Sequence, residues 1–162
     1  MRHTTFFAAF FTAFFLFCIF TGCGTAPPAD LPPLASCKVK IHNNGSPLTK
    51  IGVSFQRVDG HGGWSLNGVT GSDGIAVAKT NAGSYSANGI PTGTYRVTLS
   101  ERIELPPELI DDNDPSMPTK QQKYIDEHRT LPKTLCDPLR TPLELTVTES
   151  GAELDVDIAK FK

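Results

Sequence analysis

In several segments from Cys37 onward, apolar side chains recur at every second position. Cys37, Val39 and Ile41, for example, alternate with two lysines and a histidine. The same period appears in seven segments: 37–43, 51–58, 63–69, 74–80, 94–100, 143–149 and 153–159. A period of two belongs to a strand with one buried face, because successive side chains point to opposite sides of a sheet. We therefore expect an all-β fold, a seven-stranded antiparallel β-sandwich.

The residues between these segments also suit an antiparallel sheet. Turns are predicted at 43–46, 59–63, 72–74 and 149–151, where Gly, Asn and Asp tolerate positive φ. The side chains expected to face inward in the last two segments are Leu143, Leu145, Val147, Leu154, Val156 and Ile158. In the fourth segment, Ile75, Val77 and Lys79 fall on one face, opposite Ala76, Ala78 and Thr80.

The segment 101–142 breaks the alternation of the strands. Its first half is acidic and rich in proline, and 119–129 then follows a helical pattern. Thr119 and Gln122 have the spacing of a capping box, and Lys123 and Glu127 that of an i,i+4 ion pair. We expect a long excursion between strands that carries a short surface helix over one edge of the sandwich.

The excursion contains a run of acidic residues and an amide, Asp111 to Asp114. Carboxylate oxygens attract calcium, but an EF-hand loop needs ligands at alternate positions before a glycine, and Pro115 follows this run. The pattern favours a solvated acidic loop, and the sequence leaves calcium binding open.

The N-terminal 22 residues have a different pattern. Arg2 precedes a nearly continuous apolar run from Phe6 to Phe20, and small residues follow it. A charged start, an apolar middle and a small-residue exit are the three parts of a secretory signal peptide. A membrane-spanning helix needs roughly 20 apolar residues, so we favour a signal peptide at 1–22 over an uncleaved anchor.

The end of this leader reads Phe20-Thr21-Gly22-Cys23. It resembles the lipobox of bacterial lipoproteins, with Phe20 in place of the usual leucine. The resemblance implies cleavage after Gly22, a thioether-linked diacylglycerol on Cys23 and usually a further acyl chain on the new amino group. Two or three chains anchor a protein durably, whereas one binds a membrane only marginally. The alternative is an ordinary secreted protein whose Cys23 carries no lipid.

Residues 23–36 separate the lipid site from the first predicted strand. The stretch from 24 to 36 reads GTAPPADLPPLAS, in which four of 13 residues are proline and no hydrophobic period is visible. Such a segment favours an extended polyproline II conformation, so we expect a tether with a reach of roughly 40 Å. The protein would then face outward from a membrane of the bacterial cell envelope, with the inner and the outer membrane both left open.

Once Cys23 is lipidated, Cys37 and Cys136 are the two cysteines left in the mature chain. Exported proteins meet an oxidising compartment, where an even number of cysteines indicates a disulfide. A Cys37–Cys136 bridge would close a loop of about 100 residues, worth about 4.7 kcal/mol in the chain-entropy model. Two free thiols are the alternative, and a metal site is disfavoured because further ligands are missing.

Composition and motifs exclude several kinds of function. The formal net charge is −2 and no block of Lys and Arg is present, so we expect no nucleic-acid binding. His42, His61 and His128 are scattered without the spacing of a zinc hydrolase, and no nucleophile elbow or phosphate-binding loop is found. We expect no enzyme activity and no cofactor. A hydrolase would need a cleft that brings His42 or His128 beside a carboxylate and a hydroxyl.

Three stretches of the body, GSPLTKIGVSFQRV (45–58), GVTGSDGIAVAKT (68–80) and NGIPTGTYRVTLS (88–100), resemble the successive motifs of carboxypeptidase-regulatory-like domains. LPKTLCDPLRTPLELTV (131–147) resembles the return segment of small planctomycete-type bacterial lipoproteins. The resemblance implies a Greek-key sandwich of the transthyretin-like, or prealbumin-like, kind over 37–162.

An anchored sandwich without a catalytic constellation is expected to be a non-catalytic binding or structural module. Its partners would be the membrane, through the lipid on Cys23, and another protein of the envelope. A glycan is the alternative ligand, if Trp64 and Tyr85 are exposed near one rim. A hydrolase is the least favoured class.

Overall fold

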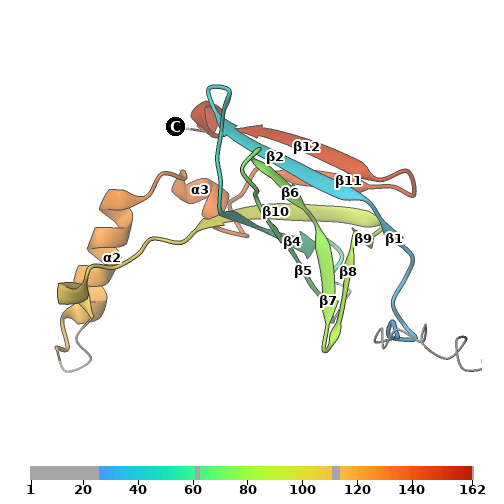
Figure 1. Ribbon diagram of the computed structural model, residues 1–162, viewed down its shortest axis with the longest axis horizontal. Coiled ribbons are helices and arrows are strands. Elements are labelled where there is room, and N and C mark those ends of the chain that lie inside the picture. The colour runs from blue at the N-terminus through green and yellow to red at the C-terminus, as the bar shows by residue number, and fades with distance from the viewer. Residues whose placement is uncertain (1–25, 61–62, 111–113, 162) are drawn as a thin grey trace, which may run out of the picture.

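The computed structural model describes residues 26–60, 63–110 and 114–161. Strands β1 to β12 are, in order, Leu34–Ala35, Cys37–Asn43, Ser46–Pro47, Ile51–Arg57, Ser65–Val69, Ile75–Val77, Lys79–Ala82, Tyr85–Asn88, Ile90–Pro91, Gly93–Glu101, Glu144–Val147 and Ala152–Asp157. The helical elements are η1 (Pro107–Leu109), α2 (Met117–His128), α3 (Lys133–Cys136) and η2 (Ile158–Phe161). The strands form a layered body, and α2 stands on an arm to one side of it (Figure 1).

The chain is mainly β, with open and largely antiparallel sheets, as the alternating pattern predicts. The larger sheet has the order β11-β10-β4-β5-β7-β8, and the smaller one groups β12, β2, β3 and β6. One pair departs from the predicted antiparallel arrangement: β12 runs parallel to β2, with Ala152 opposite Cys37. The reason is that β12 does not extend the hairpin from β11. After the single bridge between Thr148 and Gly151, the chain leaves the larger sheet and joins the smaller one.

The core lies between the two sheets and follows the predicted alternation in most strands. In β2, Cys37, Val39 and Ile41 are fully buried. Of the six C-terminal side chains predicted to face inward, five are buried, namely Leu143, Leu145, Val147, Val156 and Ile158. Leu154 is half-buried and packs at the edge of the same cluster. Burial of such alternating apolar faces is the main favourable contribution to folding.

The predicted segment 74–80 is divided between the two sheets, and its small residues form the buried face. β6 pairs with β2, whereas β7 pairs with β5, so the chain changes sheet at Ala78. Ala76, Ala78 and Thr80 are buried there, and Val77 is exposed. The sheets approach so closely at this point that a Cβ on Gly68 would lie 2.9 Å from the Val77 carbonyl oxygen. Only small side chains fit into an interior of that width.

The predicted tether ends earlier than position 36, because its last residues belong to the folded body. β1 pairs with β9, with Leu34 opposite Pro91 and Ala35 opposite Ile90. The side chain of Ala35 is buried in the core. The polyproline-like spacer therefore ends before Leu34, and the chain enters the body as a strand.

The predicted excursion forms an arm that projects from the body (Figure 1). At its base, the Glu101 carboxylate accepts hydrogen bonds from the backbone N–H groups of Thr130 and Leu131 at 2.8 and 2.9 Å. Leu131 and Leu135 are buried in the core beside them. Helix α2 lies along η1, where the Gln121 side chain donates to the Leu109 carbonyl at 2.7 Å. Only the end of the helix approaches the sheet, since Ile125 lines a hollow with Leu99 and Ser100 of β10.

The helix of the arm begins earlier than predicted. α2 spans Met117–His128 and its N-cap is Ser116, so the prediction of Thr119 as the capping residue is wrong. The Asp114 carboxylate organises this end, since it accepts from the Ser116 N–H and hydroxyl. The predicted ion pair between Lys123 and Glu127 is present at 3.8 Å. Among the described residues, no helix is both long and apolar enough to span a membrane.

Candidate binding groove

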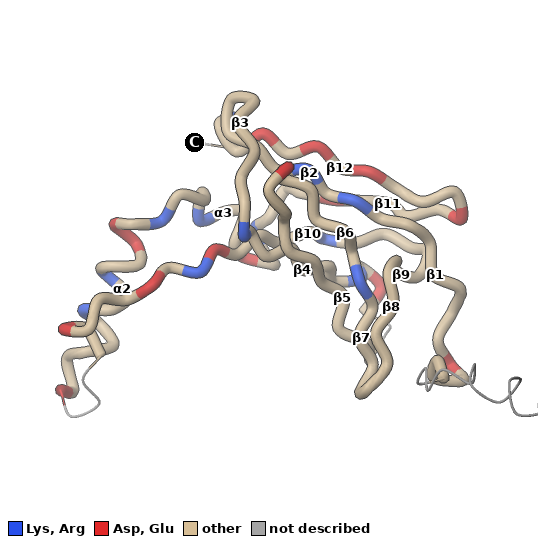
Figure 2. The backbone as a smooth tube through the Cα atoms, in the orientation of Figure 1, with Lys and Arg blue, Asp and Glu red and all other residues tan. Residues whose placement is uncertain are grey.

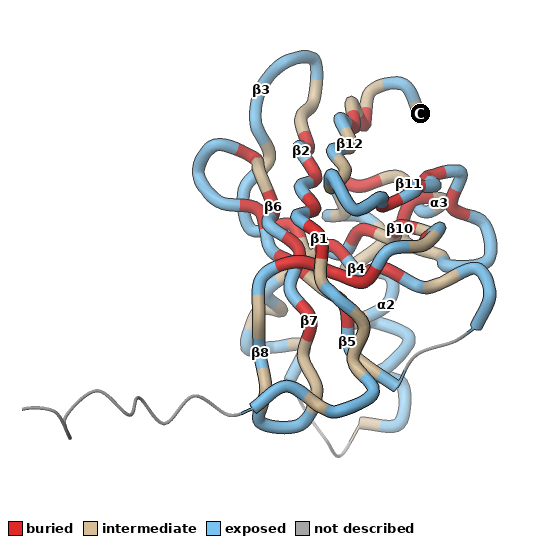
Figure 3. Tube along the Cα trace, turned by 90° about the vertical axis from the view of Figure 1, so that its right-hand side faces the viewer, coloured by how far each residue is buried: buried red, intermediate tan, exposed pale blue. Residues whose placement is uncertain are grey.

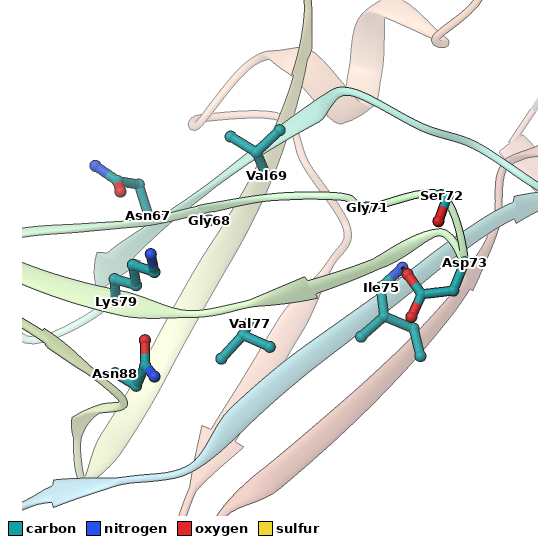
Figure 4. Close-up of a pocket in the computed structure, with 10 residues that line it drawn as sticks. All are labelled: Asn67, Gly68, Val69, Gly71, Ser72, Asp73, Ile75, Val77, Lys79 and Asn88. Atoms are coloured by element: carbon teal, nitrogen blue, oxygen red, sulfur yellow. Dashed lines mark hydrogen bonds between the residues drawn. The ribbon is translucent and has the colours of Figure 1, made fainter.

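The change of sheet at Ala78 opens a groove on the surface of the molecule. β5 continues along β4 up to Val69, while β6 turns away to pair with β2. A hollow of about 750 Å³ lies where the two strands separate, bounded by the turn at Ser72 and Asp73 (Figure 4). Its volume falls within the range of small-molecule and peptide sites. We call it the β5–β6 groove.

Two exposed valines give the groove apolar surface. The side chain of Val69 is 65% exposed and that of Val77 is 40% exposed. Both are out of phase with the buried faces of their strands, because Gly68 and Ala76 are the residues that point inward. An apolar side chain held in solvent at the rim of a hollow is a common feature of binding sites. In the sequence, a large apolar residue on the face opposite the buried one is the signal that could have located the groove.

Polar side chains cross the floor of the groove in a row. Asn67 of β5 is opposite Lys79 of β7, and Lys79 is opposite Asn88 of β8. The three are neighbours on one face of the sheet, since paired residues in adjacent strands point to the same side. Lys79 makes no ion pair with any described residue. The groove therefore offers amide donors and acceptors and one cation beside its apolar wall.

The turn predicted at 72–74 closes one end of the groove. Gly74 has φ +73°, and a Cβ there would lie 2.7 Å from the Ile41 carbonyl oxygen, so only glycine fits. The Asp73 carboxylate accepts from the Ile75 N–H at 3.0 Å. This hydrogen bond fixes the Asp73 side chain to the turn that forms the end of the groove.

The two aromatic residues of the glycan alternative lie close together at the far end of the larger sheet. Ser65 is opposite Asn81, and Tyr85 is opposite Ala82. Continuing this register places Trp64 and Tyr85 on either side of Ala82, on one face of the sheet. Both rings are half-buried, and that of Trp64 packs against the core.

Of the two cysteines predicted to form a bridge, neither is bonded in the structure, where both are free thiols. The pKa of Tyr95 is raised chiefly by burial, and Cys37 is near enough to that ring to add a small increase. Cys136, by contrast, lines a hollow with Ser100 and Glu101. From Tyr95 to Glu101 a strand extends about 20 Å, whereas a disulfide holds its two Cα atoms within about 7 Å. The structure therefore contains no Cys37–Cys136 bridge, and the bridge stays a prediction.

Both thiols sit in surroundings that disfavour the thiolate. Burial raises the pKa of Cys37 to about 11. Burial also raises the pKa of Cys136, although the nearby Arg129 guanidinium opposes that increase. A thiolate is the reactive form of cysteine, so neither residue has the environment of a nucleophile.

Both described histidines have hydrogen-bond partners. His42 lies on the outer face of the parallel pair β2–β12, where Lys38 faces Glu153 and Lys40 faces Asp155 at 3.7 Å each. Figure 2 shows basic positions along β2 next to acidic positions along β12. The His42 Nε2 atom is 2.8 Å from an Asp155 oxygen, and Nδ1 accepts from the Gly45 N–H. Both ring nitrogens are therefore occupied.

His128, on the arm, stacks on Tyr124 with ring centroids 3.8 Å apart. Its Nδ1 atom is 2.9 Å from the Tyr124 carbonyl oxygen. Among the described residues, no group of three His, Cys, Asp or Glu side chains could hold a metal ion.

Several predicted sites lie outside the described residues. These are the lipid site Cys23, the turn residue His61 and most of the acidic run, Asp111 to Asn113. The last residue of that run, Asp114, pairs with Lys120 at 2.8 Å, and this hydrogen bond is the main reason that its pKa lies well below the usual range.

Comparisons with protein-family models, with curated proteins and with solved structures gave no match to this chain.

Proposed function

We propose that the protein is a lipid-anchored, non-catalytic binding module of the bacterial cell envelope, and that it holds another envelope protein in the β5–β6 groove. The observation that carries the binding role is the exposure of Val69 and Val77 beside Lys79, which forms no ion pair with a described residue. Such a surface combines apolar area for affinity with polar groups for orientation. Its partner is expected to present apolar side chains next to a carboxylate.

The anchor is supported by the leader and by the way the chain enters the body. The lipobox-like Phe20-Thr21-Gly22-Cys23 precedes a proline-rich spacer. The spacer ends at β1, which is paired with β9 and partly buried. A pull on the lipid would therefore be transmitted to a hydrogen-bonded strand. From 24 to 33 the spacer has ten residues, and its reach would be about 31 Å in a polyproline II conformation.

The fold we propose is the Greek-key, transthyretin-like sandwich of carboxypeptidase-regulatory-like domains. The motif Pro91-Thr92-Gly93-Thr94-Tyr95 supports it, because the chain leaves β9 and starts β10 there. Gly93 has φ +150°, and the fully buried Tyr95 follows it. The motif thus has a structural role, since it aims an aromatic ring into the core.

A Cys23→Ser variant tests the anchor. We expect it to lose all labelling by radioactive palmitate and to accumulate as an unprocessed precursor in the producing bacterium, because serine has no thiol to accept the lipid. Cys18→Ser, inside the apolar run, is the matched control and should be labelled and processed like the unchanged protein. Equal labelling of the Cys23→Ser variant would contradict the anchor.

Photocrosslinking in intact cells tests the groove. A photoreactive amino acid at Val69 is expected to give one discrete adduct with an envelope protein. The same amino acid at Val58, which is 52% exposed but lies outside the groove, is the matched control and should not give that adduct. The binding role fails if Val69 gives no adduct or if both positions give the same one.

A glycan-binding module is the second candidate, since Trp64 and Tyr85 flank Ala82 on one face of the sheet. Aromatic rings in a row can stack on sugar rings, but here the Trp64 ring is partly used in core packing. A carbohydrate adduct from a photoreactive amino acid placed at Tyr85, with no protein adduct at Val69, would favour this candidate.

A further inference from the structure

The chain contains three identical Asn–Gly pairs: Asn44–Gly45, Asn67–Gly68 and Asn88–Gly89. An asparagine before glycine is prone to lose its side-chain amide, because the next backbone nitrogen can attack the side-chain carbonyl carbon and glycine offers no Cβ to hinder it. The reaction requires a mobile backbone and an accessible nitrogen. The local sequence is the same in the three pairs, but backbone mobility and the accessibility of the glycine nitrogen differ between them in the fold.

The pair Asn67–Gly68 is held in the interior of β5. The Asn67 side chain donates to the Ser65 hydroxyl at 3.0 Å and accepts from the Asn81 amide at 3.2 Å. Gly68 is buried, and a Cβ on it would collide with the Val77 carbonyl. Neither the amide nor the backbone has room to move into a cyclic intermediate.

The pair Asn88–Gly89 is protected at its nitrogen. The Gly89 N–H donates to the Ala78 carbonyl at 2.7 Å, and Gly89 is buried beneath β1. Its own carbonyl oxygen accepts from the Thr80 hydroxyl at 2.7 Å. The nucleophile is therefore bound and removed from water, even though the Asn88 side chain is exposed.

The pair Asn44–Gly45 lies at the tip of the β2–β3 hairpin, which projects from the body (Figure 3). Asn44 and Gly45 are both exposed, and a Cβ placed on Gly45 would meet no atom within 4 Å. Both have left-handed backbones, with φ of 50° and 85°. β3 has only two residues, both exposed, so the turn can open locally at a small part of the global free energy of unfolding.

A histidine faces the nitrogen of this pair. The Gly45 N–H donates to His42 Nδ1 at 3.2 Å. The other ring nitrogen is 2.8 Å from an Asp155 carboxylate oxygen, which holds the proton of the neutral ring on Nε2 and leaves Nδ1 as an acceptor. Because His42 belongs to β2 and is tied to β12, it stays in place when the turn opens.

We propose that Asn44 is a site of spontaneous deamidation, with His42 as the base, and that the fold protects Asn67 and Asn88. His42 Nδ1 takes the proton of Gly45 N as that nitrogen bonds to Asn44 Cγ. The Cγ–Nδ2 bond then breaks, and Nδ2 leaves as ammonia with the proton returned by the imidazolium. Water opens the resulting succinimide to aspartate or isoaspartate.

The product changes the hairpin in two ways. The Asn44 N–H donates to the Asp157 carboxylate at 3.0 Å, so a new carboxylate at position 44 is placed near an existing one. An isoaspartate also adds a methylene group to the backbone of a tight turn. Both effects weaken the attachment of the β2–β3 hairpin to β12. The fraction of molecules with this weakened end of the smaller sheet therefore increases with time.

Peptide mapping tests the site directly, because trypsin separates the three pairs. Cleavage after Lys40, Lys50, Arg57, Lys79 and Arg96 places them in peptides 41–50, 58–79 and 80–96. After incubation of the folded protein near neutral pH, we expect peptide 41–50 alone to show the mass gain of an amide converted to an acid. In a denaturant all three should react at similar rates. Equal reaction of the three in the folded protein would overturn the assignment.

A His42→Gln variant tests the base. We expect deamidation of Asn44 to slow about tenfold, which is below the 10²–10⁴ contribution of a well-aligned enzymic base because the hydrogen bond is long. His128→Gln on the arm is the matched control and should leave the rate unchanged. An unchanged rate in the His42→Gln variant would remove the base from the proposal.

Discussion

Replacing Tyr95 with alanine is expected to lower the free energy of unfolding by about 4 kcal/mol, the usual cost of removing a buried aromatic ring. Tyr95 is fully buried, and its hydroxyl donates to the Pro91 carbonyl at 2.7 Å. Its ring meets Phe55 edge to face at 6.4 Å between centroids and lies under the Arg57 guanidinium. The variant loses all three contacts and leaves a cavity between β10 and β4. Urea unfolding followed by circular dichroism measures the change.

Two variants separate the contributions in this prediction. Tyr95→Phe keeps the ring and leaves the Pro91 carbonyl without its donor, which should cost about 1–2 kcal/mol. Tyr85→Ala removes a half-buried tyrosine from β8 and should cost clearly less than Tyr95→Ala. If Tyr85→Ala and Tyr95→Ala were equally destabilising, the placement of Tyr95 at the centre of the core would be wrong.

Replacing Gly89 with alanine is expected to cost about 3 kcal/mol and to release the end of the tether. Gly89 has φ +99°, a left-handed conformation that costs an L-residue roughly 1–2 kcal/mol. A Cβ there would also lie 2.7 Å from the Ala35 carbonyl oxygen, so β1 must move away from β9. Urea unfolding should show the loss of stability, and limited proteolysis should show new cleavage between residues 31 and 36.

Gly83→Ala is the matched control for this experiment. Gly83 has φ +60°, but no atom lies within 4 Å of its Cβ position. It should lose about 1 kcal/mol from backbone strain alone and show no new cleavage near β1. New cleavage in both variants would mean that β1 detaches for reasons unrelated to the contact with Gly89.

The alternation of apolar residues located most of the sheet because it reports a local property. The predicted segments 37–43, 51–58 and 94–100 correspond to β2, β4 and β10. These strands lie in the middle of their sheets or pair over long stretches, so one face of each is buried throughout. Where a strand stays in one sheet with one buried face, the period of two is a direct consequence of burial.

The pattern was less informative where the fold changes direction. The segment 74–80 has two equally regular faces, and its larger side chains are the half-buried or exposed ones. Which face is buried depends on the distance between the sheets at Gly68, a property of another strand. The β7–β8 hairpin and the short β1 were not predicted, because β8 alternates half-buried and exposed side chains and β1 has only two residues.

The candidate groove also depends on segments that are distant along the chain. Val69 and Val77 are individually ordinary strand residues, and Asn67, Lys79 and Asn88 are far apart in the sequence. They form one surface because β5, β7 and β8 are in register and β6 leaves the sheet. The cysteines are the converse case: their even number suggested a bridge, but both are free thiols in the structure.

What the sequence alone determined is the mainly β character, the turn at 72–74 and the hypothesis of a lipid on Cys23, since each depends on residues adjacent along the chain. Only the tertiary structure decided the parallel pairing of β12 with β2, the free state of Cys37 and Cys136, and the site of the groove. It also distinguished Asn44 from two asparagines in identical sequence surroundings. The physical reason is that burial, register and the partner of a backbone N–H are set by segments distant along the chain.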